Sequence, residues 1–162
     1  RDALAGALDD DALARCEGWL YDPGISVVRD ALVALEVGGV RALHDPTEGG
    51  LATALAELAE ASGAGLTVDA HALPVLPECA AICEALGLDP LGLIASGSLL
   101  LAVAPEQASA VQVALETAGV PAARIGALES APGCRLREAG GAVVELPAFA
   151  RDELARALDE AG

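Results

Sequence analysis

The stretch VRALHDPTEGGL, residues 40 to 51, decides how this chain folds. A strand-like run at residues 40–43 precedes a polar loop, and an apolar run with helical spacing follows from Leu51 to Leu58. We call residues 45–50 the glycine loop. A loop with two glycines between a strand and a helix leaves backbone N–H groups free beside the positive end of a helix dipole. Such a junction is suited to hold an anion, and a phosphate above all.

The same residues also predict an ordinary helix start. Asp45 fits the N-cap, Pro46 the first helical position and Glu48 the third, which together form a capping box. Glycine pairs also occur where two stretches of backbone pass closely. The local pattern therefore leaves two interpretations open, a structural helix start and an anion site.

Turn signals divide the rest of the chain into alternating helices and strands. Helices are expected at residues 12–20, 27–37, 51–62, 77–87, 105–118 and 149–158. Strands are expected at residues 40–43, 66–69, 99–104, 124–128, 134–138 and 142–146. We expect Ser26 to cap the second helix, the apolar run 99–104 to be a central strand, and the last two strands to form a hairpin. This alternation predicts an α/β (α+β) fold, with a layered mixed β-sheet and helices on its faces.

Composition limits the classes of partner. The formal net charge is −16, and all nine basic residues among lysine and arginine are arginines. A surface this acidic repels nucleic acid and anionic lipid, so we expect neither as a partner. No apolar run reaches the length that spans a bilayer, so we expect no membrane association. The chain contains no methionine, and we expect a piece of a longer protein in which residues 1–24 are a leader helix and interdomain connection and residues 25–162 a domain.

The four cysteines are expected to be reduced thiols in a cytoplasmic protein. A chain of this length buries enough core to fold without disulfides. Cys79 and Cys83 stand one helical turn apart, which could aim two thiols at a metal ion. No pair of histidines accompanies them at ligand spacing, so we expect no metal site. Cys16, Cys79, Cys83 and Cys134 are then small hydrophobic residues.

The sequence HDPTxGGLAT at residues 44–53, followed by a glutamate-bearing helix, resembles the signature of the aminoimidazole-ribonucleotide (AIR) synthetase superfamily. Residues 73–75, 85–91 and 95–103 continue the resemblance, which covers roughly residues 25–130. It matches the C-terminal domain of those proteins, in the branch of the nitrile-forming hydrogenase maturation dehydratases. The resemblance implies a partial ferredoxin-like topology and an ATP-dependent enzyme that activates an amide-type oxygen by phosphorylation.

The resemblance also implies partners and cofactors. ATP and Mg²⁺ would be bound mainly by an N-terminal domain, and this domain would close the cleft over a small-molecule substrate. We expect a homodimer for the full-length protein, and for this domain alone no cofactor and no ATP hydrolysis. The chain has no cysteine after Cys134, so the nitrile chemistry that uses a terminal cysteine is not expected of it.

The expected site residues lie in two loops. We expect His44 and Asp45 to be catalytic, through proton relay or substrate orientation, although neighbours on a strand point to opposite faces and do not form a direct pair. The expected cofactor-binding residues are Thr47, Gly49 and Gly50, and the expected substrate-side turn contains Ser96 and Ser98.

Glu48 departs from the family pattern, which typically has arginine at this position. A carboxylate there repels a phosphate. The sequence therefore keeps two alternatives beside the enzyme: a regulatory or scaffold domain that has lost its phosphate site, and a binder of a small acidic ligand that uses Arg41.

Overall fold

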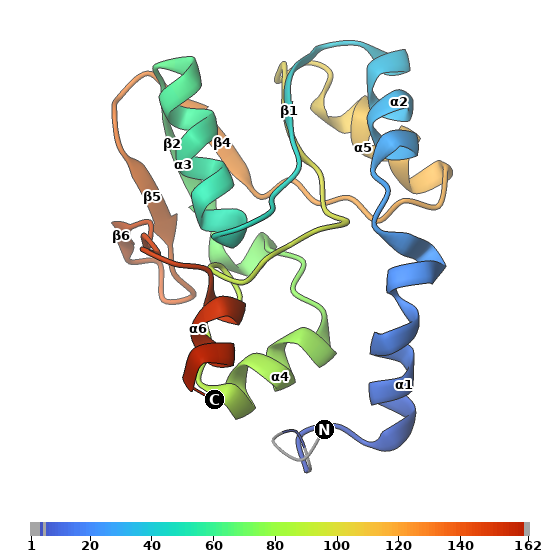
Figure 1. Cartoon of the computed structure of the whole chain (residues 1–162). Helices are drawn as coiled ribbons and strands as arrows, with labels where there is room; N and C mark the ends of the chain where they lie inside the picture. The colour runs from blue at the N-terminus through green and yellow to red at the C-terminus, as the bar shows by residue number, and fades with distance from the viewer. Residues whose placement is uncertain (1–3, 5, 161–162) are drawn as a thin grey trace.

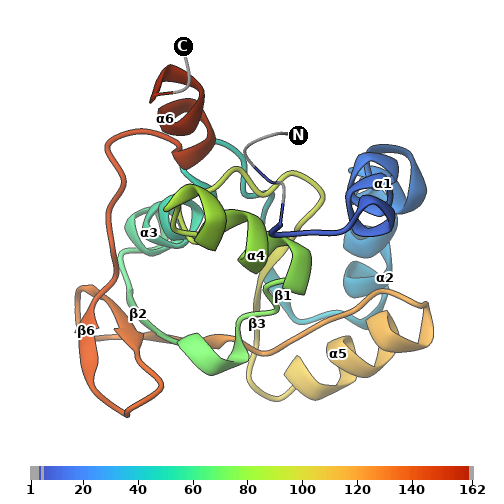
Figure 2. The same ribbon diagram turned by 90° about the horizontal axis from the view of Figure 1, so that it is seen from below.

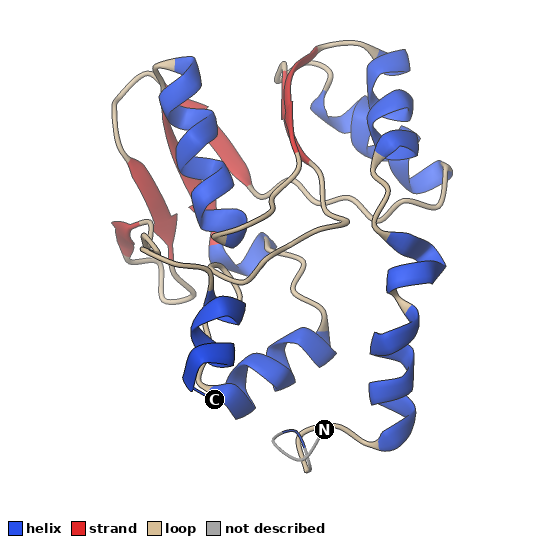
Figure 3. Ribbon diagram, viewed as in Figure 1, coloured by secondary structure: helices blue, strands red, loops and turns tan. Residues whose placement is uncertain are grey.

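The computed structural model describes residue 4 and residues 6–160, which form six helices and six strands (Figures 1 and 3). The helices are α1 (Asp10–Gly18), α2 (Val28–Val37), α3 (Gly50–Ser62), α4 (Pro77–Leu86), α5 (Ala108–Thr117) and α6 (Glu153–Glu160). The strands are β1 (Val40–His44), β2 (Gly65–Asp69), β3 (Leu100–Val103), β4 (Gly126–Glu129), β5 (Cys134–Arg137) and β6 (Val143–Glu145). Single helical turns, η2 (Leu20–Gly24) and η3 (Ala70–Ala72), follow α1 and β2.

The strands are divided between two sheets. β4, β2, β5 and β6 form a mixed sheet in that order, in which β2 is parallel to β5 and antiparallel to β4. β5 and β6 form the predicted hairpin. β1 and β3 form a separate antiparallel pair. The layered α/β class and the mixed sheet are thus confirmed.

The prediction that residues 99–104 form a central strand is wrong. Within the described residues, β3 pairs with β1 alone. The run is apolar because the strand lies between two cores rather than between two strands. Leu100 belongs to the core around α3, whereas Leu101 and Val103 pack against the core around α2 and α5. Figure 2 shows β1 and β3 between these two groups of helices.

The first core joins α3 to the mixed sheet. Small alanines on α3 allow the helix to approach the strands closely, and Leu55, Leu66 and Val68 fill the contact. The second core is smaller and is centred on Ala34, Val111 and Leu115, where α2 crosses α5. The scarcity of aromatic side chains is consistent with this close packing.

Helix α2 keeps an apolar face in solvent. The predicted stripe of Val28, Leu32 and Leu35 is present, but these side chains are 63%, 56% and 49% exposed, and Ala34 faces the core instead. The expected Ser26 cap is wrong, because the N-cap residue is Val27 and no side chain caps this helix. An exposed apolar face of this kind is typical of a surface that binds another protein segment or domain.

Helix α1, in the segment expected to be a leader, makes an ion pair with α4. Asp9 caps α1 by accepting the Ala12 N–H at 2.7 Å. Arg15 of α1 donates to Glu78 of α4 at 3.2 Å. Over residue 4 and residues 6–160, no helix is both long and apolar enough to cross a bilayer.

Candidate functional site

α3 begins at Gly50, next to the expected start at residue 51, and not at Pro46 as the capping-box interpretation requires. The N-cap is Gly49, with φ +77°, and no side chain caps the helix, so the predicted capping box of Asp45 and Glu48 is wrong. Two successive glycines with positive φ turn the chain after Pro46 and delay the helix. Asp45 and Glu48 are therefore exposed loop residues.

Gly50 allows a close approach between two segments of backbone. A Cβ at this position would lie 2.5 Å from the carbonyl oxygens of Leu91 and Leu93. The Ala52 N–H donates to the Leu91 carbonyl at 3.0 Å, which joins the start of α3 to the same turn. The structural interpretation of this glycine, that of close backbone passage, is thereby confirmed.

The amide groups at the start of α3 bind protein acceptors. The Gly50 N–H donates to the carbonyl of Thr47 at 3.0 Å. The Gly49 N–H donates to Oδ2 of Asp152 at 2.8 Å, across 103 positions of sequence. An anionic oxygen thus already lies at the helix N-terminus, where a carboxylate is electrostatically favoured. Asp152 was not predicted from sequence, since nothing local links it to the loop.

His44 is paired with a carboxylate of α3. Its Nε2 lies 2.7 Å from Oε2 of Glu57, and the side chains are 29% and 59% exposed. A half-buried imidazole beside an exposed carboxylate can hold or pass a proton at the surface of the loop. Sequence reasoning named His44 and rejected a direct pair with Asp45. It missed Glu57, whose signal was its place in the glutamate-bearing helix after the loop.

The β1–β3 ladder brings the two predicted site segments to one end. His44, the last residue of β1, is opposite Leu100, the first residue of β3. The glycine loop and the turn with Ser96 and Ser98 therefore leave the ladder at the same edge. Both serines and Thr47 are exposed. The serine turn lies close to residues 24 and 25, since a Cβ at Gly97 would lie 3.4 Å from the Cα of Ile25 and 3.6 Å from the carbonyl oxygen of Gly24.

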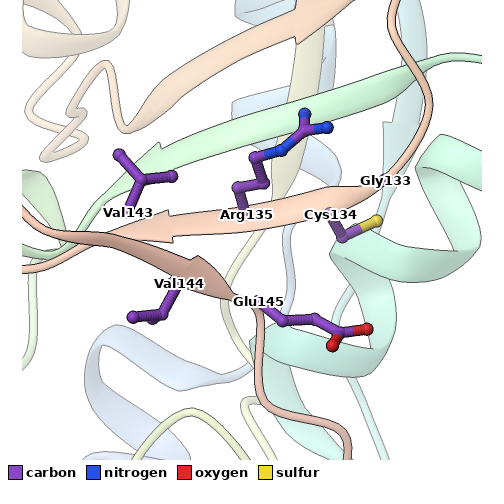
Figure 4. Close-up of a pocket in the computed structure, with 6 residues that line it drawn as sticks. All are labelled: Gly133, Cys134, Arg135, Val143, Val144 and Glu145. Atoms are coloured by element: carbon purple, nitrogen blue, oxygen red, sulfur yellow. The ribbon is translucent and has the colours of Figure 1, made fainter.

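A shallow hollow of about 360 Å³ lies elsewhere, on the β5–β6 hairpin (Figure 4). Its lining residues are Gly133, Cys134, Arg135, Val143, Val144 and Glu145. Cys134 and Arg135 point to opposite sides of β5 in Figure 4. The Arg135 guanidinium is already engaged by the Pro132 carbonyl at 2.8 Å and by Glu129 at 3.6 Å. None of the predicted site residues belongs to this hollow.

The cysteines are four free thiols. Burial, with the neighbouring Cys79, raises the pKa of the Cys83 thiol to about 11. Such a thiol stays protonated at neutral pH and is a poor metal ligand. Within the part of the chain that the structure describes, no three His, Cys, Asp or Glu side chains are grouped to hold a metal ion.

A mixed α/β domain with a glycine loop between β1 and α3 has the architecture of the AIR-synthase type of C-terminal domain. The chain belongs to the family described as AIR synthase related protein, C-terminal domain, whose model matches residues 24–138. The family that the HDPTxGG motif indicated is thus confirmed.

Several curated and solved relatives are named as HypE, a hydrogenase maturation protein. The carbamoyl dehydratase HypE of Rhizobium leguminosarum bv. viciae is 40% identical over 135 residues, which are 76% of this chain and 39% of that protein. The crystal structure of E. coli HypE, a hydrogenase maturation protein, has a TM-score of 0.74 and 34% identity over 81% of this chain and 42% of that chain. A crystal structure of HypE in complex with ATP has a TM-score of 0.67 and 36% identity over 73% and 38%. The chain spans about two fifths of the length of these relatives.

Proposed function

We propose that this chain is the C-terminal domain of an ATP-dependent enzyme that activates an amide-type oxygen, that of a carbamoyl group, by phosphorylation. The observation that carries the proposal is the family match, which includes the glycine loop and the His44–Glu57 pair. The relatives named carbamoyl dehydratase and the relative solved with ATP support the reaction class.

The residues of the glycine loop have distinct roles in this proposal. The Gly49 amide binds an anionic oxygen of Asp152 in this structure, so its geometry fits an anion. Gly49, Gly50 and the exposed hydroxyl of Thr47 would meet the phosphates of ATP, which supplies the phosphoryl group when bound. Mg²⁺ would be held mainly by the N-terminal half, and the isolated domain would not hydrolyse ATP.

His44 is the proposed proton carrier. Glu57 orients the imidazole through the 2.7 Å contact and compensates its charge when it takes a proton. Asp45, the next residue, would orient the substrate from the other side of the strand end. Ser96 and Ser98 leave the same end of the β1–β3 ladder and would line the substrate side.

The exposed face of α2 fits a protein partner within the same enzyme. Val28, Leu32 and Leu35 present a stripe of apolar side chains that the described domain leaves uncovered. We propose that the N-terminal half packs there, and that the complete protein is a homodimer in the cytoplasm.

The alternative is a regulatory or scaffold domain without catalysis. The exposed carboxylate of Glu48 favours it, because a negative charge in the glycine loop repels a phosphate.

The two histidines of the chain give a matched test. In the protein extended by the sequence that precedes residue 1, we would measure ATP-dependent phosphate release with a carbamoyl substrate for His44→Gln and His71→Gln. His71 lies apart and contacts the carbonyl of Ala139. We expect His44→Gln to lower the rate about 100-fold, as loss of an acid–base group does, and His71→Gln to leave it unchanged. Equal rates in the two variants, or no activity in the extended wild type, would favour the scaffold alternative.

A further inference from the structure

Helix α6 is attached through polar contacts rather than through an apolar face. Within residues 153–160 the buried side chain is that of Glu153, whereas Leu154 and Leu158 are exposed. Oε2 of Glu153 accepts the Asp89 N–H at 2.9 Å, and the Glu153 N–H donates to the Gly92 carbonyl at 3.0 Å. Arg156 donates to Glu153 and to the Gly87 carbonyl, both at 2.8 Å. Elements with few buried apolar contacts open at low free energy.

The residue before α6 joins this helix to the glycine loop. Oδ1 of Asp152 accepts the Leu154 N–H at 2.8 Å, which is an N-cap contact for α6. Oδ2 of the same carboxylate accepts the Gly49 N–H at 2.8 Å. One side chain thus begins α6 and occupies the amide at the start of α3. Figure 1 shows α6 beside the end of α3 where that helix begins.

The Gly49 amide cannot serve two anions. A carboxylate oxygen and a phosphate oxygen are the same kind of acceptor, and one N–H donates one strong hydrogen bond. Two anionic groups at this distance also repel each other. Binding of an anion to Gly49 and the contact with Asp152 are therefore mutually exclusive.

Phe149 packs against the first core and so anchors the start of this segment. We propose that residues 150–160, which follow it, form a latch, which closes the glycine loop while Asp152 is bound to Gly49 and opens to admit the anionic group of the ligand. This inference rests on the proposed function, in which the loop meets a phosphoryl group. While the latch is closed, the Gly49 amide is not free, so only the fraction of molecules with an open latch can bind an anion. Any change that raises this fraction lowers the apparent Kd for the anion.

The test compares two aspartates of the same segment. Asp152→Ser keeps a residue that caps α6 well but is too short to reach Gly49. Asp159→Ser removes the same charge at an exposed site, where Asp159 pairs with Arg151. In the 162-residue chain, amide hydrogen exchange of Gly49 is measured by NMR. We expect Asp152→Ser to speed exchange about tenfold or more, as loss of a charge-assisted hydrogen bond does, and Asp159→Ser to leave it unchanged.

A second measurement titrates each variant with tripolyphosphate and follows the Gly49 and Gly50 amide signals. We expect the apparent Kd to fall about tenfold in Asp152→Ser relative to both the wild type and Asp159→Ser. Asp152→Asn, which keeps the shape of the side chain, replaces Asp152→Ser in both measurements if thermal melts show that the serine variant does not fold.

The outcomes separate the latch from the proposed function. Unchanged Gly49 exchange in the Asp152 variant overturns the latch and leaves the histidine test of the proposed function intact. Faster exchange without tripolyphosphate binding in any variant overturns both the anion role of the loop and the gating of a ligand by the latch. Faster exchange with tighter binding, in the Asp152 variant alone, supports the latch.

Discussion

Two helices meet at the glycine loop, and they are held in opposite ways. α3 buries Ala52, Ala54, Leu55 and Ala59 in the first core. α6 buries one side chain, the carboxylate of Glu153, and is held by hydrogen bonds and ion pairs. Apolar burial depends little on pH, whereas charge-assisted contacts change with protonation. The glycine loop is therefore flanked by one helix, α3, whose attachment depends little on pH, and by a second helix, α6, whose attachment weakens when its charged groups change protonation.

The largest expected effect tests the apolar attachment of α3. Leu55→Ala removes a buried side chain of α3 and leaves a cavity against Leu66 and Val68. We expect a loss of about 3 kcal/mol in the free energy of unfolding, measured by urea denaturation. Leu158→Ala, at an exposed position of α6, is the control and should cost less than about 0.5 kcal/mol. Similar losses in both variants would contradict the contrast between the helices.

The second prediction concerns the turn at Gly49, which lies between α3 and α6. Gly49 and Gly63 both have positive φ, but a Cβ at Gly49 would lie 2.3 Å from Oγ1 of Thr53, whereas the space at Gly63 is open. Gly63→Ala should cost about 1–2 kcal/mol from backbone strain alone. Gly49→Ala should cost about 1 kcal/mol more, because Thr53 must move, and Thr53→Ala should recover part of that difference. Urea denaturation of Gly63→Ala, Gly49→Ala, Thr53→Ala and the double variant Gly49→Ala/Thr53→Ala measures these terms, and equal costs at both glycines would refute the clash.

The third prediction concerns the loss of the polar attachment of α6 in acid. A hydrogen bond from Arg156, and then the Asp89 N–H, lower the pKa of Glu153 to about 2 from the ordinary 4.5. Because the folded pKa is depressed, its stabilisation is present above pH 4.5 and is lost as the pH falls towards 2. Glu153→Gln should cost about 2 kcal/mol at pH 7 and flatten the stability curve in that window.

The charged and titratable groups near Glu153 have to be considered in the interpretation of this measurement. They are Arg156 on its own helix, Asp89 on the facing turn and the Cys83 thiol on α4. Asp159→Asn removes an exposed carboxylate of α6 whose pKa is also lowered, by the hydrogen bond from Arg151, and it should change the slope between pH 4.5 and 2 less than Glu153→Gln does. An unchanged slope in Glu153→Gln would mean that other carboxylates control acid unfolding.

Most elements could be predicted from sequence because their signals are local. Pro77 and Gly87 mark the ends of α4, and the hairpin of β5 and β6 follows from two strand-like runs around a glycine pair. The start of α3 agrees with the expected range, but the local pattern could not exclude a cap at Asp45 and Pro46, because the decisive contact of Gly50 with Leu91 is tertiary. The position of β3 was misplaced because an apolar strand between two cores has the same composition as a central strand.

The site could be predicted only as far as its contacts are local. His44 was found from the motif, whereas its partner Glu57 lies 13 positions away on another element. Asp152 lies 103 positions from Gly49 and shares no pattern with it. Contacts at such separations depend on how the elements pack, which no short window of sequence records.

The smallest expected effect applies the Glu153 substitution to the other helix. Glu57→Gln replaces the carboxylate that contacts His44, but this contact is largely exposed and α3 is held by its apolar face. Exposed pairs contribute little, so the free energy of unfolding should fall by less than about 1 kcal/mol in urea denaturation at pH 7. A loss of 2 kcal/mol or more would make the pair a structural element and weaken its proposed part in proton transfer. A Glu→Gln change that is nearly neutral on α3 and costly on α6 would show that burial of the carboxylate decides which helix can detach. A carboxylate that is merely near the glycine loop would not be enough. Any loss of activity in Glu57→Gln would in that case be due to chemistry at His44 rather than to an unfolded loop.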